Sequence, residues 1–144
     1  MTDRVSHDHP TVDTIDATLE RYGGTTRPEI RLPASDAVPV GEVVRIVLAG
    51  TTYRTQIAER EDGTAAIRGA YETPRLARNP GSASDALQLW VAERDLEFGR
   101  TVHVDVVEPG VKLGLRAPGE TATYASIGRP KDSLASIAKD LEEN

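Results

Sequence analysis

The 144-residue chain contains no cysteine, and this absence excludes disulfide bonds, thiolate nucleophiles and zinc sites built on cysteine. It also has no apolar run of about 18 residues, the length that a membrane-spanning helix requires. No basic segment followed by an apolar one stands at its start. From these absences we expect a soluble cytoplasmic protein with no membrane span and no signal peptide.

Lysine and aromatic residues are scarce as well. The chain has one phenylalanine, and only three of its 17 basic residues are lysine. The 23 acidic residues give a formal net charge of −6, which argues against a wholly basic nucleic-acid-binding protein. Low lysine, excess acid and the lack of cysteine are together typical of a high-salt cytoplasm and a GC-rich genome, although codon bias alone explains the composition equally well.

The acidic residues are unevenly distributed along the chain. Residues 1–29 hold six acidic and three basic side chains, and residues 82–144 hold eleven and seven. Residues 30–81 hold six acidic and seven basic side chains. The middle of the sequence is therefore the only part whose charge balance favours an anion.

The length corresponds to one domain. We assign residues 1–10 to a flexible amino terminus and residues 11–144 to a single domain, with a barrel over residues 30–126 and a carboxy-terminal helix over residues 132–142. A second terminal helix is expected after Thr11, because apolar residues recur there at helical spacing. The apolar positions are Val12, Ile15, Leu19 and Tyr22 for the first helix and Leu134, Ile137, Ala138 and Leu141 for the last.

Between these ends the apolar period changes from 3.6 to 2, the period of a half-buried strand. The strongest alternation covers residues 101–106, and Asp62-Gly63 and Pro109-Gly110 are typical turn pairs. One helix is inserted over residues 84–95, with Ser82 or Ser84 as its cap. The predicted fold is α+β and mainly β: a small barrel of six or seven strands, with an inserted helix and flanking amino- and carboxy-terminal helices.

Residues 38–48 share a pattern with residues 96–106, at a constant offset of 58 residues. Each copy reads apolar, any, apolar, glycine, charged, any, and then alternating apolar residues. Gly41 and Gly99 stand at the same place, where a turn into a strand can require a positive φ angle. The alternative explanation is a chance similarity between two segments that each lead into a β-hairpin.

This repeated pattern resembles the two halves of a double-psi β-barrel, a fold of the cradle-loop barrel group. It is most similar to the amino-terminal substrate-recruiting domains of valosin-type AAA unfoldases, in which a Gly-Asp turn precedes each of two strands and an arginine-bearing loop lies between them. Here the turns read Gly41-Glu42 and Gly99-Arg100, with Arg75 and Arg78 between them. Because both aspartates are replaced, the resemblance implies a barrel and a protein-interaction module, and it transfers no activity.

The chain as a whole resembles short haloarchaeal proteins of a family of unknown function. The stretches that carry this resemblance are residues 67–71, 75–78 and 132–138. It implies a high-salt cytoplasm and no particular activity.

The best candidate site in the sequence is the loop that carries Arg68, Tyr71, Arg75 and Arg78, in which Glu72 is the single acid. Guanidinium groups beside an aromatic ring can hold a phosphate backbone and stack on an unpaired RNA base, and Arg54 and Arg60 are in reach of the same side. The alternative is that these arginines pair with acids elsewhere and fasten a long loop to the barrel.

No catalytic motif is present. The sequence lacks a G-x-S-x-G elbow, a phosphate-binding P-loop and an H-E-x-x-H motif. His7 and His9 lie on a terminus where histidines seldom bind metal, and His103 is expected on the exposed face of a strand. We therefore expect no enzymatic activity, no metal and no cofactor. A deep polar pocket around His103 and Asp105 in the structure would favour the alternative that the protein is an enzyme.

Two hypotheses for function follow. The first is a non-enzymatic binding module for RNA or another polyanion, through Arg68, Tyr71, Arg75 and Arg78. The second is an adaptor that binds a protein partner, in keeping with the resemblance to unfoldase domains.

Overall fold

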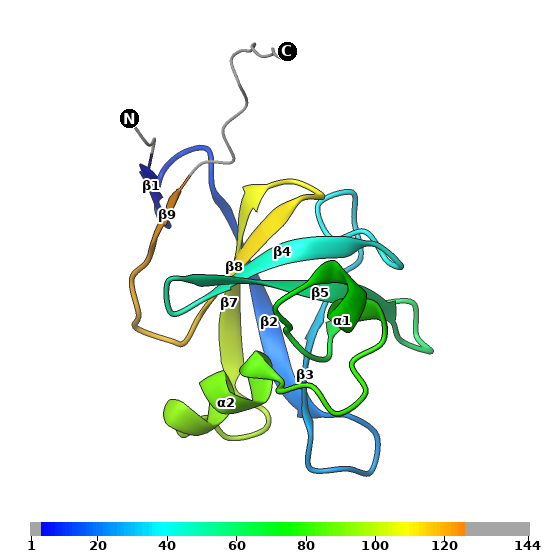
Figure 1. Ribbon diagram of the computed structural model, residues 1–144. Helices are drawn as coiled ribbons and strands as arrows, with labels where there is room; N and C mark the ends of the chain where they lie inside the picture. Colours follow the sequence, from blue (N-terminus) through cyan, green and yellow to red (C-terminus); the bar gives the residue numbers. More distant parts are fainter. Residues whose placement is uncertain (1–3, 126–144) are drawn as a thin grey trace, which may run out of the picture.

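The computed structural model describes residues 4–125 (Figure 1). Seven strands close into a barrel in the order β2-β3-β6-β5-β4-β8-β7. Neighbouring strands are antiparallel except β4 and β8, which run parallel. The strands are β2 (Asp13–Arg21), β3 (Pro28–Leu32), β4 (Val43–Leu48), β5 (Thr51–Glu59), β6 (Ala65–Ile67), β7 (Thr101–Glu108) and β8 (Lys112–Arg116). The mainly β barrel predicted from the sequence is confirmed.

Two short strands lie outside the barrel. β1 (Arg4–Ser6), within the segment assigned to the amino terminus, pairs antiparallel with β9 (Thr123–Ala125). The strand expected at the end of the barrel is thus β9, which pairs with β1 and joins no barrel strand. The barrel strands run from residue 13 to residue 116 rather than over residues 30–126.

The expected amino-terminal helix is instead β2. Ile15, Ala17 and Leu19 also alternate with polar residues, so the same segment fits a period of two. The ladders on both sides decide between the two periods, because β2 pairs with β7 on one edge and with β3 on the other. Leu19 is fully buried as a result, and Tyr22 lies beyond the end of the strand. The helix expected over residues 132–142 lies outside the described residues.

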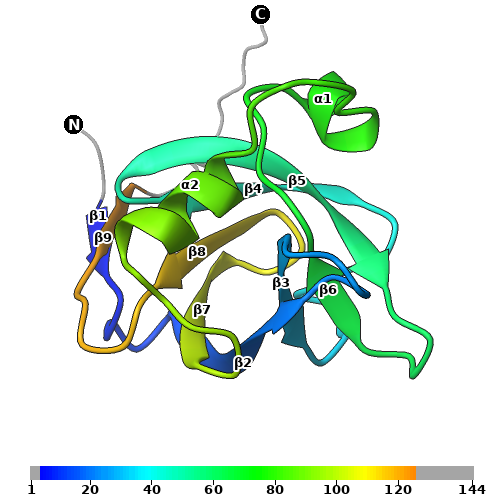
Figure 2. The same ribbon diagram turned by 90° about the horizontal axis from the view of Figure 1, so that it is seen from below.

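The inserted helix is α2 (Ala86–Glu93), and it lies across one end of the barrel, as the view from below shows (Figure 2). Its cap is Asp85 rather than either predicted serine, because the Asp85 carboxylate accepts a hydrogen bond from the Leu87 amide at 2.9 Å. Leu87 and Trp90 are buried in the barrel core. A second, short helix, α1 (Pro74–Arg78), was not predicted; it lies outside the barrel wall against β5 (Figures 1 and 2).

The two turns of the repeated pattern have the same geometry. Gly41 and Gly99 have φ angles of 89° and 96°. The Gly41 amide donates to the Ile57 carbonyl at 2.8 Å, and the Gly99 amide donates to the Leu19 carbonyl at 2.7 Å. The β4–β5 pair and the β7–β2 pair therefore begin in the same way, and β3 and β6, which follow β2 and β5, pair with each other.

Candidate functional site

The predicted loop leaves the barrel after β6 and first crosses β5. The backbone groups of Tyr71 and Arg54 exchange two hydrogen bonds, with N–O distances of 2.6 and 2.8 Å. The Tyr71 side chain is buried and folds back over Gly69. A Cβ atom on Gly69 would lie 2.6 Å from the Tyr71 hydroxyl, so any larger residue at this position would have to displace the Tyr71 ring.

Three of the four predicted site residues line one cleft of about 350 Å³: Arg68, Tyr71 and Arg78. Tyr22 and Arg27, from the loop between β2 and β3, complete it. We call this set of five residues the arginine cleft. It joins two loops that are far apart in the sequence around three guanidinium groups and two phenol rings.

Arg68 is held in place from two sides. Its Nε donates to Glu29 at 2.8 Å, and its guanidinium carbon lies 4.4 Å from the centre of the Tyr22 ring, within the range of a cation–π contact. Glu29 is 2% exposed and also pairs with Arg60. Within residues 4–125 the two terminal nitrogens of Arg68 have no hydrogen-bond partner, so they are free to meet an anion.

Arg27 is tied to the start of α2. Its Nη2 lies 3.3 Å from the Asp85 carboxylate, which also accepts the Ala70 amide at 3.0 Å. The Tyr71 side chain, and after it Asp85, hold the pKa of Arg27 above its usual value. The cleft is thereby connected to the helix that closes the barrel.

The two arginines of α1 differ in position. The Thr73 hydroxyl caps this helix by accepting the Leu76 amide at 3.1 Å, and Ala77 is buried. Arg78 is exposed and lines the arginine cleft, whereas Arg75 is exposed and does not line it. Neither has a carboxylate within 4.0 Å in the described part of the chain.

Arg54 and Arg60, which were expected on the same side, do not join the cleft. Arg60 pairs with Glu20 and Glu29, and Arg54 lines a separate cleft. Tyr22 and Arg27 were not predicted as site residues, because the apolar spacing placed Tyr22 on a helix. A hairpin over residues 13–32 would have brought both beside the predicted loop.

The ion pairs of the arginines fit the interpretation that they fasten the loop, but only for two of the three residues in the cleft. Glu29 and Asp85 compensate Arg68 and Arg27, as expected for a loop that is fastened to the barrel. Arg78 remains without such a partner among residues 4–125. Among the described residues, two of the three arginines in the cleft thus have a carboxylate partner, and Arg78 carries the unpaired positive charge.

Asp105 is the centre of a buried polar cluster. This fully buried carboxylate accepts hydrogen bonds from Thr14 (2.7 Å), Arg116 (2.7 and 3.0 Å) and Tyr124 (2.5 Å). Burial raises the pKa of Asp105, but the hydrogen bonds from Arg116, Thr14 and Tyr124 outweigh it and hold the pKa below its usual value. Burial, and after it Asp105, raise the pKa of Tyr124. The cluster fastens β9 to the barrel.

Histidines and carboxylates do not form a metal site in the part of the chain that the structure describes. His103 lies on a strand, with its Nδ1 3.0 Å from the exposed carboxylate of Asp16. His9 contacts the Thr11 hydroxyl at 2.8 Å. No helix among residues 4–125 is long and apolar enough to cross a membrane.

Comparison with known proteins gives a family but no function. No curated protein and no solved structure matches the chain. The model of a family of unknown function, DUF7112, matches residues 1–141. The resemblance to a family of unknown function is therefore confirmed. With nearly its whole length covered, the chain belongs to the DUF7112 family.

Proposed function

We propose that the chain binds RNA, or another polyanion with phosphodiester chemistry, in the arginine cleft. The observation that carries this proposal is the convergence of Arg27, Arg68 and Arg78 on one open cleft that also holds two tyrosines. Guanidinium groups bind phosphate oxygens through paired hydrogen bonds. Aromatic rings bind bases by stacking, which is tolerant of sequence.

The geometry suggests how one nucleotide unit would bind. Arg78 and the terminal nitrogens of Arg68 would hold a phosphate, because neither is saturated by hydrogen bonds within residues 4–125. Arg68 covers one face of the Tyr22 ring, and Tyr22 is 41% exposed. A base can therefore stack on the open part of this ring, for a gain of about 1–3 kcal/mol.

The carboxylates that pair with Arg68 and Arg27 support binding by fixing these side chains in advance. A preordered arginine loses less side-chain entropy when a ligand binds. The same carboxylates reduce the net charge of the cleft, so long-range attraction is weak. At high salt, where the Debye length falls to about 3 Å at 1 M, direct contacts and stacking would have to supply the affinity.

The test is fluorescence anisotropy with a labelled single-stranded RNA of about eight nucleotides, within the site sizes of small barrels. Arg78→Gln should weaken binding about tenfold or more, as expected for the loss of a charge-assisted hydrogen bond. Tyr22→Ala should weaken it to a similar degree. Arg4→Gln is the matched control, because Arg4 is an exposed arginine on β1, outside the barrel. Equal binding by all four proteins would contradict the proposal.

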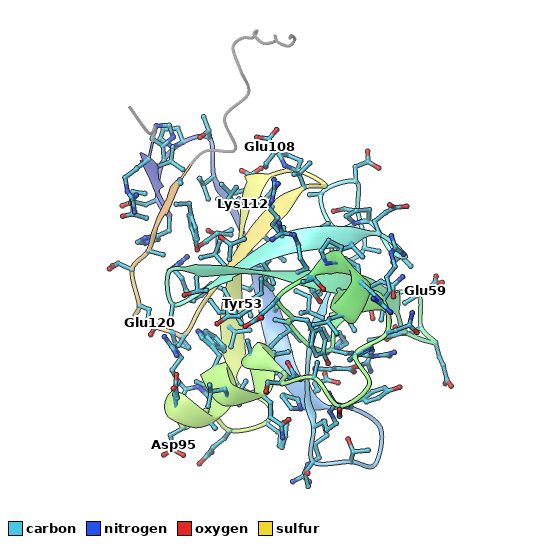
Figure 3. The ribbon with its side chains drawn as sticks, viewed as in Figure 1. Tyr53, Glu59, Asp95, Glu108, Lys112 and Glu120 are labelled. Carbon is cyan, nitrogen blue, oxygen red and sulfur yellow. The ribbon has the colours of Figure 1, made fainter. Side chains whose placement is uncertain are left out.

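An adaptor role is the second candidate, and a different surface favours it. A groove of about 630 Å³ is lined by Tyr53, Leu76, Leu89 and nearby alanines, and Leu89 is 60% exposed. Figure 3 shows Tyr53 in the space between β5 and α2. Glu72 also lines the groove, which suits a partner segment that has an apolar anchor beside a basic residue.

Selection from a random peptide display library tests this second candidate. Enrichment of peptides with an apolar residue next to a basic one, lost in Leu89→Glu, would support it. Absence of enrichment would contradict it.

The finer parts of the sequence resemblance also stay proposals. Kinship with double-psi barrels is supported by the equivalent turns at Gly41 and Gly99. A haloarchaeal source and a cytoplasmic location are supported by the excess of acidic over basic residues and the lack of cysteine.

A further inference from the structure

A row of three cations crosses adjacent strands of the barrel. Arg45 on β4 lies directly opposite Arg54 on β5 and next to Lys112 on β8. Residues in register on adjacent strands project from the same face of a sheet, about 5 Å apart from strand to strand. Ile46, Ile57 and Leu113 on the same strands fill the core, so this row lies on the outer face. We call it the cation row.

The charges of the cation row are not balanced by acids in the described part of the chain. Neither Arg45 nor Arg54 has a carboxylate within 4.0 Å there. Glu108 stands in register with Lys112 but forms no ion pair with it within residues 4–125. Figure 3 shows Glu108 at the tip of the β7–β8 hairpin, with Lys112 below it beside β4.

Such an arrangement costs stability unless an anion joins it. Like charges directly opposite each other on paired strands repel. The Lys112 ammonium is nearly buried and donates to the Ala125 carbonyl at 2.7 Å. Burial, and after it Arg45, lower the pKa of Lys112. The lysine offers a ligand little contact surface, so Arg45 and Arg54 are the residues of the row that can contact an anion.

The cation row borders a cleft of about 350 Å³ that Arg45 and Arg54 line together with Pro74. Pro74 begins α1, whereas Ala77 and Arg78 at the other end of α1 line the arginine cleft. Gln56 and Ala58, two and four residues beyond Arg54 on β5, also line the arginine cleft. At about 3.3 Å per residue, Arg54 in the second cleft is about 7–13 Å along β5 from Gln56 and Ala58 in the arginine cleft. The helix α1 contributes residues to both clefts.

We propose that Arg45 and Arg54 form a second phosphate site, and that a bound single strand runs from the arginine cleft past α1 to the cation row. This inference rests on the proposed function and names its ligand as a phosphodiester chain longer than one nucleotide. Each phosphate contact on a single strand changes the slope of log K against log salt by about 0.7. One phosphate held at the cation row therefore adds about 0.7 to that slope.

The experiment compares a dinucleotide with a single-stranded RNA of about eight nucleotides, using the wild-type chain, Arg45→Gln/Arg54→Gln and the control Arg4→Gln. We expect the double variant to bind the longer RNA at least tenfold more weakly, with a shallower salt dependence, and to bind the dinucleotide unchanged. Unchanged affinity and slope for the longer RNA would overturn the second site. The single variant Arg54→Gln, which keeps one arginine in place, should give an intermediate loss.

A second arm separates this inference from the proposed function. Inorganic tripolyphosphate should raise the thermal midpoint of the wild-type chain and of Arg78→Gln, and it should raise that of Arg45→Gln/Arg54→Gln by clearly less, because only the arginine cleft is left in the double variant. If RNA fails to bind and this pattern still appears, the proposed function fails while an anion site at the cation row stands. If tripolyphosphate raises no midpoint, or raises that of the double variant equally, the cation row is not an anion site.

Discussion

The substitution Asp105→Asn removes a negative charge that is fully buried where β7, β8 and β9 meet. In the wild-type chain this carboxylate receives two hydrogen bonds from Arg116 and one each from Thr14 and Tyr124. Asparagine has a similar shape, but one of its two terminal groups is a donor. In either orientation of the amide, its NH₂ group would therefore face another donor, Arg116 or Tyr124.

The magnitude follows from the burial of the partner. The Arg116 side chain is 9% exposed, so water compensates only a small part of the lost carboxylate. Removing one partner of a buried ion pair costs about 3–5 kcal/mol, which is a large share of the roughly 5–15 kcal/mol that stabilises a domain. Because asparagine keeps one acceptor oxygen, we expect about 3–4 kcal/mol within that range.

Urea unfolding followed by circular dichroism measures this loss as a lower midpoint at constant slope. Asp16→Asn is the matched control. The Asp16 side chain is 76% exposed and pairs with His103 across β2 and β7, the two strands that also carry Thr14 and Asp105. The control should unfold at the wild-type midpoint. Equal midpoints for Asp105→Asn and Asp16→Asn would refute the reasoning that burial makes Asp105 structurally important.

The remaining predictions concern pH and backbone geometry. Because the pKa of Asp105 is lower in the folded chain, its contribution to stability is complete above the unfolded pKa of about 3.9 and is lost as the pH falls through the folded pKa. The unfolding midpoint should therefore fall less steeply with decreasing pH in Asp105→Asn than in the wild-type chain. An equally steep fall in both proteins would contradict this role of Asp105. Gly69→Ala should displace the buried Tyr71 ring, which should cost about 1–3 kcal/mol of stability by overpacking and weaken RNA binding. In the same thermal-unfolding and anisotropy measurements, Gly24→Ala should match the wild-type chain, because a Cβ atom at Gly24 meets open space. Gly41→Ala and Gly99→Ala should each cost about 1–2 kcal/mol because both need a positive φ angle; markedly unequal losses in urea unfolding would contradict the equivalence of the two turns.

Periodicity predicted most of the barrel but failed where two periods overlap. Ile15 and Leu19 are four residues apart, so they fit one face of a helix as well as one face of a strand. Only the pairing of β2 with β3 and β7 selects the strand. That pairing is a tertiary effect, which a local pattern does not contain.

The candidate site was predicted in part for a similar reason. Arg68, Tyr71 and Arg78 were found from their local composition, and they do line one cleft. Arg75 has the same chemistry but does not line that cleft, because its place on α1 depends on how the helix packs. Tyr22 completes the cleft from a loop more than 40 residues away in the sequence.

The cation row could not be predicted from the sequence alone. Arg45 and Arg54 become neighbours through a hairpin whose register a sequence could suggest. Lys112 joins them only because β8 runs parallel to β4 on its other edge. A parallel pairing between strands so far apart leaves no short-range signal.

The most direct test of the arginine cleft is a two-dimensional NMR titration that observes the arginine Nε–Hε groups while a short single-stranded RNA is added. We expect the signals of Arg27, Arg68 and Arg78 to shift together and saturate at one RNA concentration, while that of Arg4 stays in place. Shifts confined to arginines outside the cleft, or no shift at Arg78, would contradict the proposal.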